Sequence, residues 1–335
     1  MSRIGQAVFT LFVVLTISFF MYRLLPGGPI EAMREQLVQQ AVSQGDQVDI
    51  ERINHLVELR TGIQPDEPVW KQYLFYLRDI VVYQDFGQSI WQNKPVFDLL
   101  FKAMPWSVFI SIYGLLLGFV TNILLGSLMA YREGGHLDKS MSLVATILTS
   151  VPYYVAAILM LSVLAFGQGW FPTGGRYNHA LTPGFTLPFM ISVIRHAALP
   201  ILTGFVVGFG GQALAMRGNS IRVMGEDYIR VAELRGLGEG RIASRYVMRN
   251  AILPLYTSLM IGIASIFSSS IIMEQLFSYP GVGWYTFGAI ENRDFPLLMG
   301  IFLFFTTVTL IGVLIAEFTY GIIDPRATTG EREAY

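Results

Sequence analysis

Long apolar stretches without any charge are the feature that most limits what this chain can fold into. A transmembrane helix needs about 20 predominantly apolar residues to cross the hydrocarbon core of a bilayer. Six stretches have this length and contain no Asp, Glu, Lys or Arg. We therefore predict an all-α integral membrane protein with six transmembrane helices, at Ile4–Tyr22, Trp106–Ala130, Ser140–Phe166 (kinked by Pro152), Ala197–Met216, Ala251–Met273 and Phe295–Ala316.

The composition agrees with a membrane protein. Charged residues make up 14% of the 335 residues, against about 25% in soluble domains, and the mean hydropathy is +0.50. The net charge of −1 gives no support to a nucleic-acid partner. Cysteine is absent, which excludes disulfides, thiolate metal sites and a cysteine nucleophile.

The first apolar stretch has a second interpretation, a cleaved signal peptide with Arg3 as its positive flank. No small-x-small cleavage site follows this stretch, because the chain continues with Tyr22 and Arg23. We therefore expect residues 1–25 to form an uncleaved first transmembrane helix.

A long polar segment, residues 26–105, separates the first two predicted spans. Apolar residues at helical spacing cover Ile30–Val42 and Val48–Leu59, and Pro68 opens a third helical run. The segment is therefore predicted to be helical, either as a small cap or as helices lying on the bilayer surface.

The loop Arg217–Asn250 sets the predicted orientation, because membrane-protein loops this rich in arginine stay in the cytoplasm. Counting spans from it places both termini and the short loop Arg132–Lys139 in the cytoplasm. Residues 26–105 and the aromatic loop Gly167–His196 then lie outside. Residues 106–320 form a five-helix core that includes the loop, and residues 321–335 form a cytoplasmic tail.

The same loop has the pattern of two short helices around a glycine turn. Tyr228–Arg235 contains no helix breaker, three glycines follow, and Arg241–Asn250 is a second helical run before Pro254. This shape suits the docking of a soluble partner on the cytoplasmic face. A solvated anchor loop that only sets the topology is the alternative.

The sequence contains no P-loop and no HExxH motif, and its histidines have no metal-ligand spacing; they are His55, His136, His179 and His196. The absence of ionisable residues inside the spans argues against a self-powered secondary transporter, although sodium coupling through backbone carbonyls stays open. Small residues recur in the spans, as the GxxxG pairs Gly114/Gly118 and Gly204/Gly208 and as serines 265 and 268–270. We interpret them as packing within one subunit, and a polar passage at the serine cluster is the alternative.

Several stretches resemble the ABC importer permeases, and more narrowly their dipeptide, oligopeptide and nickel branch. The cytoplasmic loop resembles the conserved loop of these permeases, often called the EAA loop, at Tyr228–Leu237 and Arg249–Pro254. The other matching stretches, which fall outside the predicted spans, are Leu24–Pro29, Asp85–Ile90, Lys94–Val96, Glu274–Gly283 and, in the tail, Asp324–Arg326. The resemblance runs nearly from end to end and in the family's order.

The resemblance implies a division of labour. Two permease subunits, expected to be different chains, form the pathway through the bilayer of the cell membrane. Two ABC ATPase subunits bind ATP on the cytoplasmic side, and an extracytoplasmic substrate-binding protein delivers the cargo, so this chain is expected to be no enzyme and to need no cofactor. The residues expected to dock the ATPase are Tyr228, Arg230, Ala232, Glu233, Arg235, Gly236 and Arg241, and those of the extracytoplasmic motif are Glu274, Pro280, Gly281 and Gly283.

One position departs from the family pattern. Arg230 stands where the general motif has a glutamate, so the role of that glutamate does not carry over. The branch carries dipeptides, oligopeptides, nickel and oligosaccharides, among which the sequence does not choose. A self-sufficient transporter or channel, which would move solute without an ATPase, and a membrane scaffold without cargo are the alternative functions.

Overall fold

The computed structural model describes residues 3–24, 29–44, 49–61, 67–252, 255–256, 258–259, 262 and 270–323. Within these ranges the regular structure is helical, apart from an isolated bridge between Gln88 and Pro95. Four described helices are long and apolar enough to cross a membrane, or five if a bent pair counts as one span. The all-α prediction is confirmed. The fifth predicted span, Ala251–Met273, lies largely outside the described residues, as do the predicted tail and most of the predicted serine cluster.

Contacts divide the chain into two compact units. The first contains residues 1–107 and 280–314, and the second contains residues 108–279 and 315–335. The long helix α5 (Val96–Tyr131) begins in the first unit and continues in the second.

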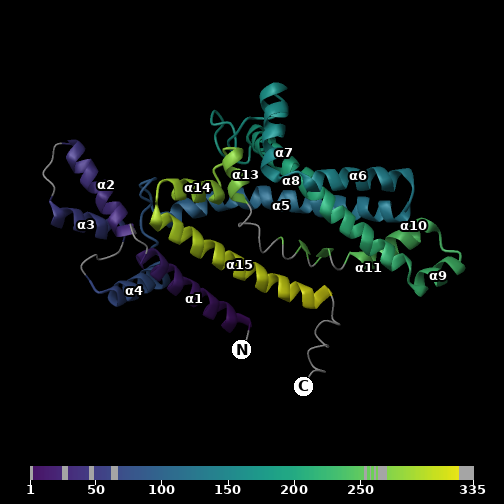
Figure 1. Ribbon diagram of the computed structural model, residues 1–335, viewed down its shortest axis with the longest axis horizontal. Helices are drawn as coiled ribbons and strands as arrows, with labels where there is room; N and C mark the ends of the chain where they lie inside the picture. Colours follow the sequence, from purple (N-terminus) through teal and green to yellow (C-terminus); the bar gives the residue numbers. More distant parts are fainter. Residues whose placement is uncertain are drawn as a thin grey trace, which may run out of the picture. The chain divides into compact units, whose positions relative to one another are not determined.

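In the first unit, α1 (Arg3–Leu24) packs on α4 (Val69–Arg78), which continues into a π-helical stretch at Asp79–Tyr83. Figure 1 shows α1 beside α4 and α15 (Phe295–Ile323). Leu15, Ile80 and Leu303 form their shared core. The Arg23 Nε atom donates to the buried Gln72 Oε1 atom over 2.9 Å. The charged residue that directly follows the first predicted span therefore has a hydrogen-bond partner on α4.

Two short helices, α2 (Pro29–Gln44) and α3 (Ile50–Thr61), form a helical pair with its own small core. The residues of this core are Met33, Leu37, Ile53 and Val57. With α4, they confirm the prediction that the segment after the first span is helical.

A buried aspartate organises the rest of the first unit. Asp294 precedes α15 and caps it, because its Oδ1 atom accepts the Leu297 N–H at 3.1 Å. Its Oδ2 atom accepts the Ser89 hydroxyl at 2.5 Å and the Trp91 N–H at 3.0 Å. A Cβ on Gly288 of α14 (Val282–Glu291) would lie 2.4 Å from the Trp91 ring. The stretch after Asp85 is therefore fixed onto α14 and α15.

The two longest helices exceed the predicted spans at both ends. α5 has 36 residues and α8 (Leu187–Met224) has 38, so α8 is about 57 Å long at 1.5 Å per residue, while the hydrocarbon core is about 30 Å thick. Hydropathy marks only the apolar middle of such a helix. Leu187–His196, predicted as the end of an aromatic loop, is the first part of α8, so the non-helical stretch ends at Thr186.

The third predicted span is not one kinked helix. α6 (His136–Ser150) and α7 (Tyr153–Met160), which continues into a π-helical stretch at Leu161–Gly167, meet at 99°. Val151 adopts an extended conformation before Pro152, as residues before proline favour, and this interrupts the helix. The prediction of a single kinked span at Ser140–Phe166 is therefore wrong in its geometry.

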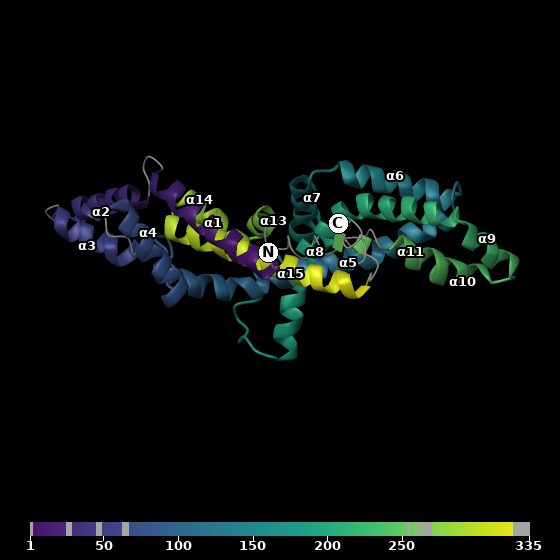
Figure 2. The ribbon, with the colours of Figure 1, turned by 90° about the horizontal axis from the view of Figure 1, so that it is seen from below.

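α6 lies along α8 in both views (Figures 1 and 2). A Cβ on Gly210 would lie 2.0 Å from the Ala145 carbonyl oxygen, so only glycine permits this approach. Near the start of α6, the buried Asp138 carboxylate accepts two hydrogen bonds from Arg217, from Nε at 2.5 Å and from Nη2 at 2.8 Å. This bidentate pair fixes α6 to α8 two turns before α8 ends.

Candidate functional site

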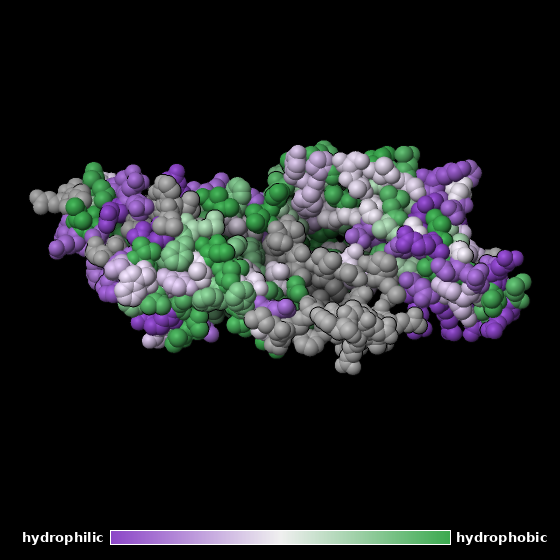
Figure 3. All heavy atoms as spheres, turned by 60° about the horizontal axis from the view of Figure 1, so that its bottom comes forward, coloured by the Kyte–Doolittle hydropathy of each residue, from purple (hydrophilic) through white to green (hydrophobic). Residues whose placement is uncertain are grey.

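The predicted docking loop begins where α8 ends. Gly225 caps α8, and α9 (Asp227–Leu234) follows directly. The second helical run consists of α10 (Glu239–Ile242), a π-helical stretch (Ala243–Met248) and α11 (Arg249–Ala251). Both predicted helical runs are confirmed, and hydrophilic side chains gather around this loop (Figure 3, right).

One face of α9 is buried inside the loop itself. Ile229 and Ala232 form an apolar cluster with Ile242 and Val247 of the second helical run. Ala232 is only 3% exposed. The structure thus places this predicted docking residue on the inner face of α9, where its small side chain permits close packing of the two runs.

The end of α9 has the hydrogen bonds of a Schellman motif. Gly236 has a φ of +70°, which is the left-handed region that favours glycine. Its N–H donates to the Glu233 carbonyl at 2.8 Å, and the Leu237 N–H donates to the Ala232 carbonyl at 3.3 Å. Gly236 therefore ends α9 and turns the chain toward α10.

The other face of α9 is an exposed apolar stripe. Tyr228, Val231 and Leu234 follow one another at three-residue spacing and are 39%, 46% and 81% exposed. The charged residues predicted to dock the ATPase are also exposed; they are Arg230, Glu233, Arg235 and Arg241. The sequence prediction missed Val231 and Leu234, although their spacing from Tyr228 was a usable signal.

The motif Glu274–Gly283, predicted to be extracytoplasmic, is divided between the two units. In the second unit, α13 (Ser270–Leu276) carries Glu274, whose side chain is buried, and its carbonyl accepts the Tyr279 N–H at 2.8 Å. Burial first, and the nearby Glu274 second, raise the pKa of the Tyr279 phenol. In the same unit, the Gly175 N–H donates to the Ser278 carbonyl at 3.0 Å, so the loop after α7 contacts the motif.

The second half of the motif begins α14 in the first unit. Gly281 is the residue before the helix, and Gly283 is buried in its first turn. The Val282 N–H donates to the buried Ser107 hydroxyl of α5 at 2.8 Å, and Pro280 is half-buried. Each half of the motif is thus part of a packed element within its own unit.

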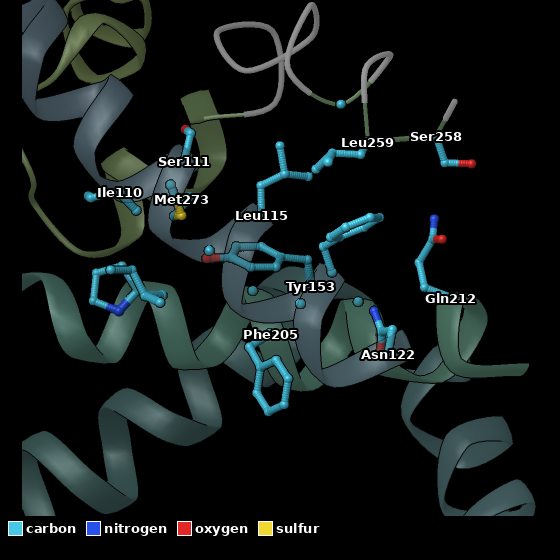
Figure 4. A pocket seen from close by; sticks show the side chains of 18 of the residues that line it. Ile110, Ser111, Leu115, Asn122, Tyr153, Phe205, Gln212, Ser258, Leu259 and Met273 are labelled. Carbon is cyan, nitrogen blue, oxygen red and sulfur yellow. The ribbon is translucent and has the colours of Figure 1, made fainter. Parts of the chain in front are cut away.

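The second unit also contains a cavity of about 560 Å³, which is lined by residues of α5, α7, α8 and α13 and by described residues between α11 and α13. Figure 4 shows Tyr153 near its centre, with Ser111 and Met273 on one side and Gln212 on the other. The GxxxG residues, predicted to pack helices together, line this cavity instead; they are Gly114, Gly118, Gly204 and Gly208. That prediction is wrong for these glycines, because a Cβ on Gly114, Gly204 or Gly208 meets no described atom within 4 Å. The close helix contacts lie instead at Gly210, two residues after Gly208, and at Gly126, eight residues after Gly118.

Comparisons with known proteins agree with the sequence motifs. The family model described as "Binding-protein-dependent transport system inner membrane component" matches residues 122–329, which include the docking loop. The chain is 28% identical to the Dipeptide transport system permease protein DppB of Lactococcus lactis over 97% of each chain. It is 29% identical to DppB of Bacillus subtilis over 97% of this chain and 96% of the relative.

A third relative is the Oligopeptide transport system permease protein OppB of Haemophilus influenzae, 30% identical over 97% of each chain. The family match covers more than half of the chain, and these relatives match it nearly from end to end. The chain therefore belongs to the family of binding-protein-dependent transport system inner membrane components.

Proposed function

We propose that this chain is one of two permease subunits of an ATP-driven importer of peptides. The relatives named above are permeases of dipeptide and oligopeptide transport systems. ATP is bound by two separate ABC ATPase subunits, because this sequence contains no P-loop. An extracytoplasmic binding protein delivers the peptide, and a second, different permease completes the pathway.

In the proposed topology, six helices cross the cell membrane and both termini are cytoplasmic. The helical segment at residues 26–105 lies outside, where the binding protein docks, and the loop Arg217–Asn250 lies inside, where the ATPase docks. ATP-driven closure of the ATPases then shifts the permeases between outward-open and inward-open states.

The exposed stripe of α9 is the observation that carries the proposal. Its inner face and its Schellman turn hold α9 in place without any partner, so Tyr228, Val231 and Leu234 are available to an apolar cleft on the ATPase. Exposed apolar side chains grouped on one short helix are typical of an interaction surface. The arginines around the stripe favour an acidic rim on the partner and contribute to specificity.

The test is purification of the chain in mild detergent from its native membrane, with partners identified by mass spectrometry. The native chain is expected to bring the ATPase and the second permease. Leu234→Asp is expected to lose the ATPase and keep the second permease, because a desolvated carboxylate replaces a leucine whose burial contributes about 2 kcal/mol. Leu187→Asp is the matched control, since Leu187 is also a highly exposed leucine and lies at the start of α8, whereas α9 follows the end of α8.

Two outcomes would count against the proposal. The first is an ATPase that stays bound to the Leu234→Asp chain as tightly as to the native chain. The second is recovery of the native chain alone, still able to move solute into liposomes without ATP, which is the behaviour of a self-sufficient transporter.

A further inference from the structure

The glycine-lined cavity of the second unit has the size of a ligand site. Its volume of about 560 Å³ falls in the range of small-molecule pockets, about 300 to 1,000 Å³. α5 and α8 each contribute two glycines to its wall. A Cβ built on Gly114, Gly204 or Gly208 meets no atom within 4 Å in the part of the chain that the structure describes. These three glycines therefore leave open space, whereas Gly210 and Gly126 permit close contact between helices.

Two buried polar groups of the cavity lining have no partner in the protein. Asn122 is 3% exposed, and no group of the described residues hydrogen-bonds its Oδ1 atom. The hydroxyl of Tyr153 is also buried without a partner there. Both residues line the cavity. Buried polar groups are nearly always hydrogen-bonded, so two such atoms on one cavity indicate a ligand that supplies the missing partners.

The chemistry of the lining favours one class of ligand group. Among the described residues, the lining contains no Asp, Glu, Lys, Arg or His, so no fixed charge selects a charged side chain. Its polar members are carboxamides and hydroxyls, which both donate and accept hydrogen bonds. A peptide main-chain amide needs both a hydrogen-bond acceptor for its N–H and a donor for its carbonyl. Every peptide contains such amides, whatever its sequence.

We propose that Asn122 and Tyr153 bind the main chain of a peptide inside this cavity, and that the four glycines leave room for its side chains. The inference rests on the proposed function, because it takes the cargo to be a peptide. It adds a cargo site within this subunit, with Asn122 Oδ1 accepting a peptide N–H and the Tyr153 hydroxyl contacting a peptide carbonyl.

The experiment measures peptide uptake by the complete importer, with its ATPases, second permease and binding protein, in proteoliposomes. Asn122→Leu and Tyr153→Phe are each expected to reduce uptake about tenfold, the effect of one lost hydrogen bond. The reduction is expected to be equal for peptides with small and large side chains. Gly208→Leu is expected to reduce uptake of a tryptophan-containing peptide much more than that of a glycine-only peptide. Gly211→Leu, on the same helix but outside the lining, is the matched control.

N-methylated peptides separate cargo contact from a merely structural role of Asn122. A peptide without the N–H cannot donate to Asn122, so methylation is expected to reduce uptake about tenfold more with the native chain than with Asn122→Leu. Any effect of methylation on the binding protein is common to both chains and cancels in this ratio.

The outcomes distinguish the two proposals. A native importer that takes up no peptide would refute the proposed function. A native importer that transports peptides, but whose Tyr153→Phe and Asn122→Leu variants match it, would refute the cargo site alone. The same holds if methylation affects both chains equally. If Asn122→Leu does not assemble, Tyr153→Phe and Gly208→Leu still decide the question.

Discussion

At the scale of single residues, the turn after α9 depends on the backbone conformation of Gly236. Its φ of +70° costs an L-residue about 1 kcal/mol, and no described atom lies within 4 Å of an added Cβ. We predict that Gly236→Leu uncouples ATP hydrolysis from uptake while the chain stays inserted in the membrane. The reason is that the Schellman turn opens and α9 loses its fixed direction. Uptake and ATPase activity of the assembled importer in proteoliposomes measure this.

A matched pair of alanine variants isolates the backbone effect. Gly240 is equally open but has an ordinary helical φ, so Gly240→Ala is expected to be neutral where Gly236→Ala weakens the turn. Hydrogen exchange at the Leu237 amide, which donates to the Ala232 carbonyl, reports the turn directly. Normal uptake by Gly236→Leu would show that the turn has no role in coupling.

At the scale of helices, local patterns predicted most elements and tertiary contacts decided the rest. The run Tyr228–Arg235 was recognisable as a helix because its periodicity is local. That run has two apolar stripes, and only contact with Ile242 and Val247 decides that Ala232 faces inward and Leu234 outward. The GxxxG glycines and Gly210 are likewise indistinguishable by sequence. The GxxxG glycines nevertheless line a cavity, whereas Gly210 contacts α6.

The Asp138–Arg217 pair leads to a prediction about α6 and α8. Asp138 is buried and Arg217 is partly exposed, so removing Arg217 leaves a buried carboxylate without its partner, which costs about 1 to 3 kcal/mol. We therefore expect Arg217→Met to lower the thermal unfolding temperature of the detergent-solubilised chain, because the buried Asp138 carboxylate loses its two hydrogen bonds to Arg217. The double variant Asp138→Leu with Arg217→Met is expected to recover part of the loss, since no charge is then left buried.

The comparison is a double-mutant cycle. If the effects of Asp138→Leu and Arg217→Met simply add in the double variant, the two side chains do not stabilise each other and the pair does not fix α6 to α8. Thr121→Val, on α5 and away from the pair, controls for the loss of a polar side chain from a helix of the same unit.

At the scale of the whole molecule, the 99° bend between α6 and α7 decides the topology. In the proposed topology, in which the bent pair crosses the membrane, the loop with Phe185 lies outside, on the same side as the segment with Tyr83. Leu234 then lies inside. If the pair instead enters and leaves on one side, Phe185 lies inside and α8 carries Leu234 outside. The number of spans and the location of the docking loop therefore depend on this bend.

The chain contains no cysteine, so single cysteines can be labelled without any background. Tyr83, Phe185 and Leu234 are exposed in the structure and are the three positions to substitute. We predict that, in cells that produce the chain without its ATPases, a membrane-impermeant maleimide labels Tyr83→Cys and Phe185→Cys in intact cells, and Leu234→Cys only after the membrane is opened. Labelling of Leu234→Cys in intact cells, with Phe185→Cys protected, would make the bent pair re-entrant. The docking loop would then lie on the wrong side for a cytoplasmic ATPase, so this outcome would overturn the proposed coupling as well as the topology.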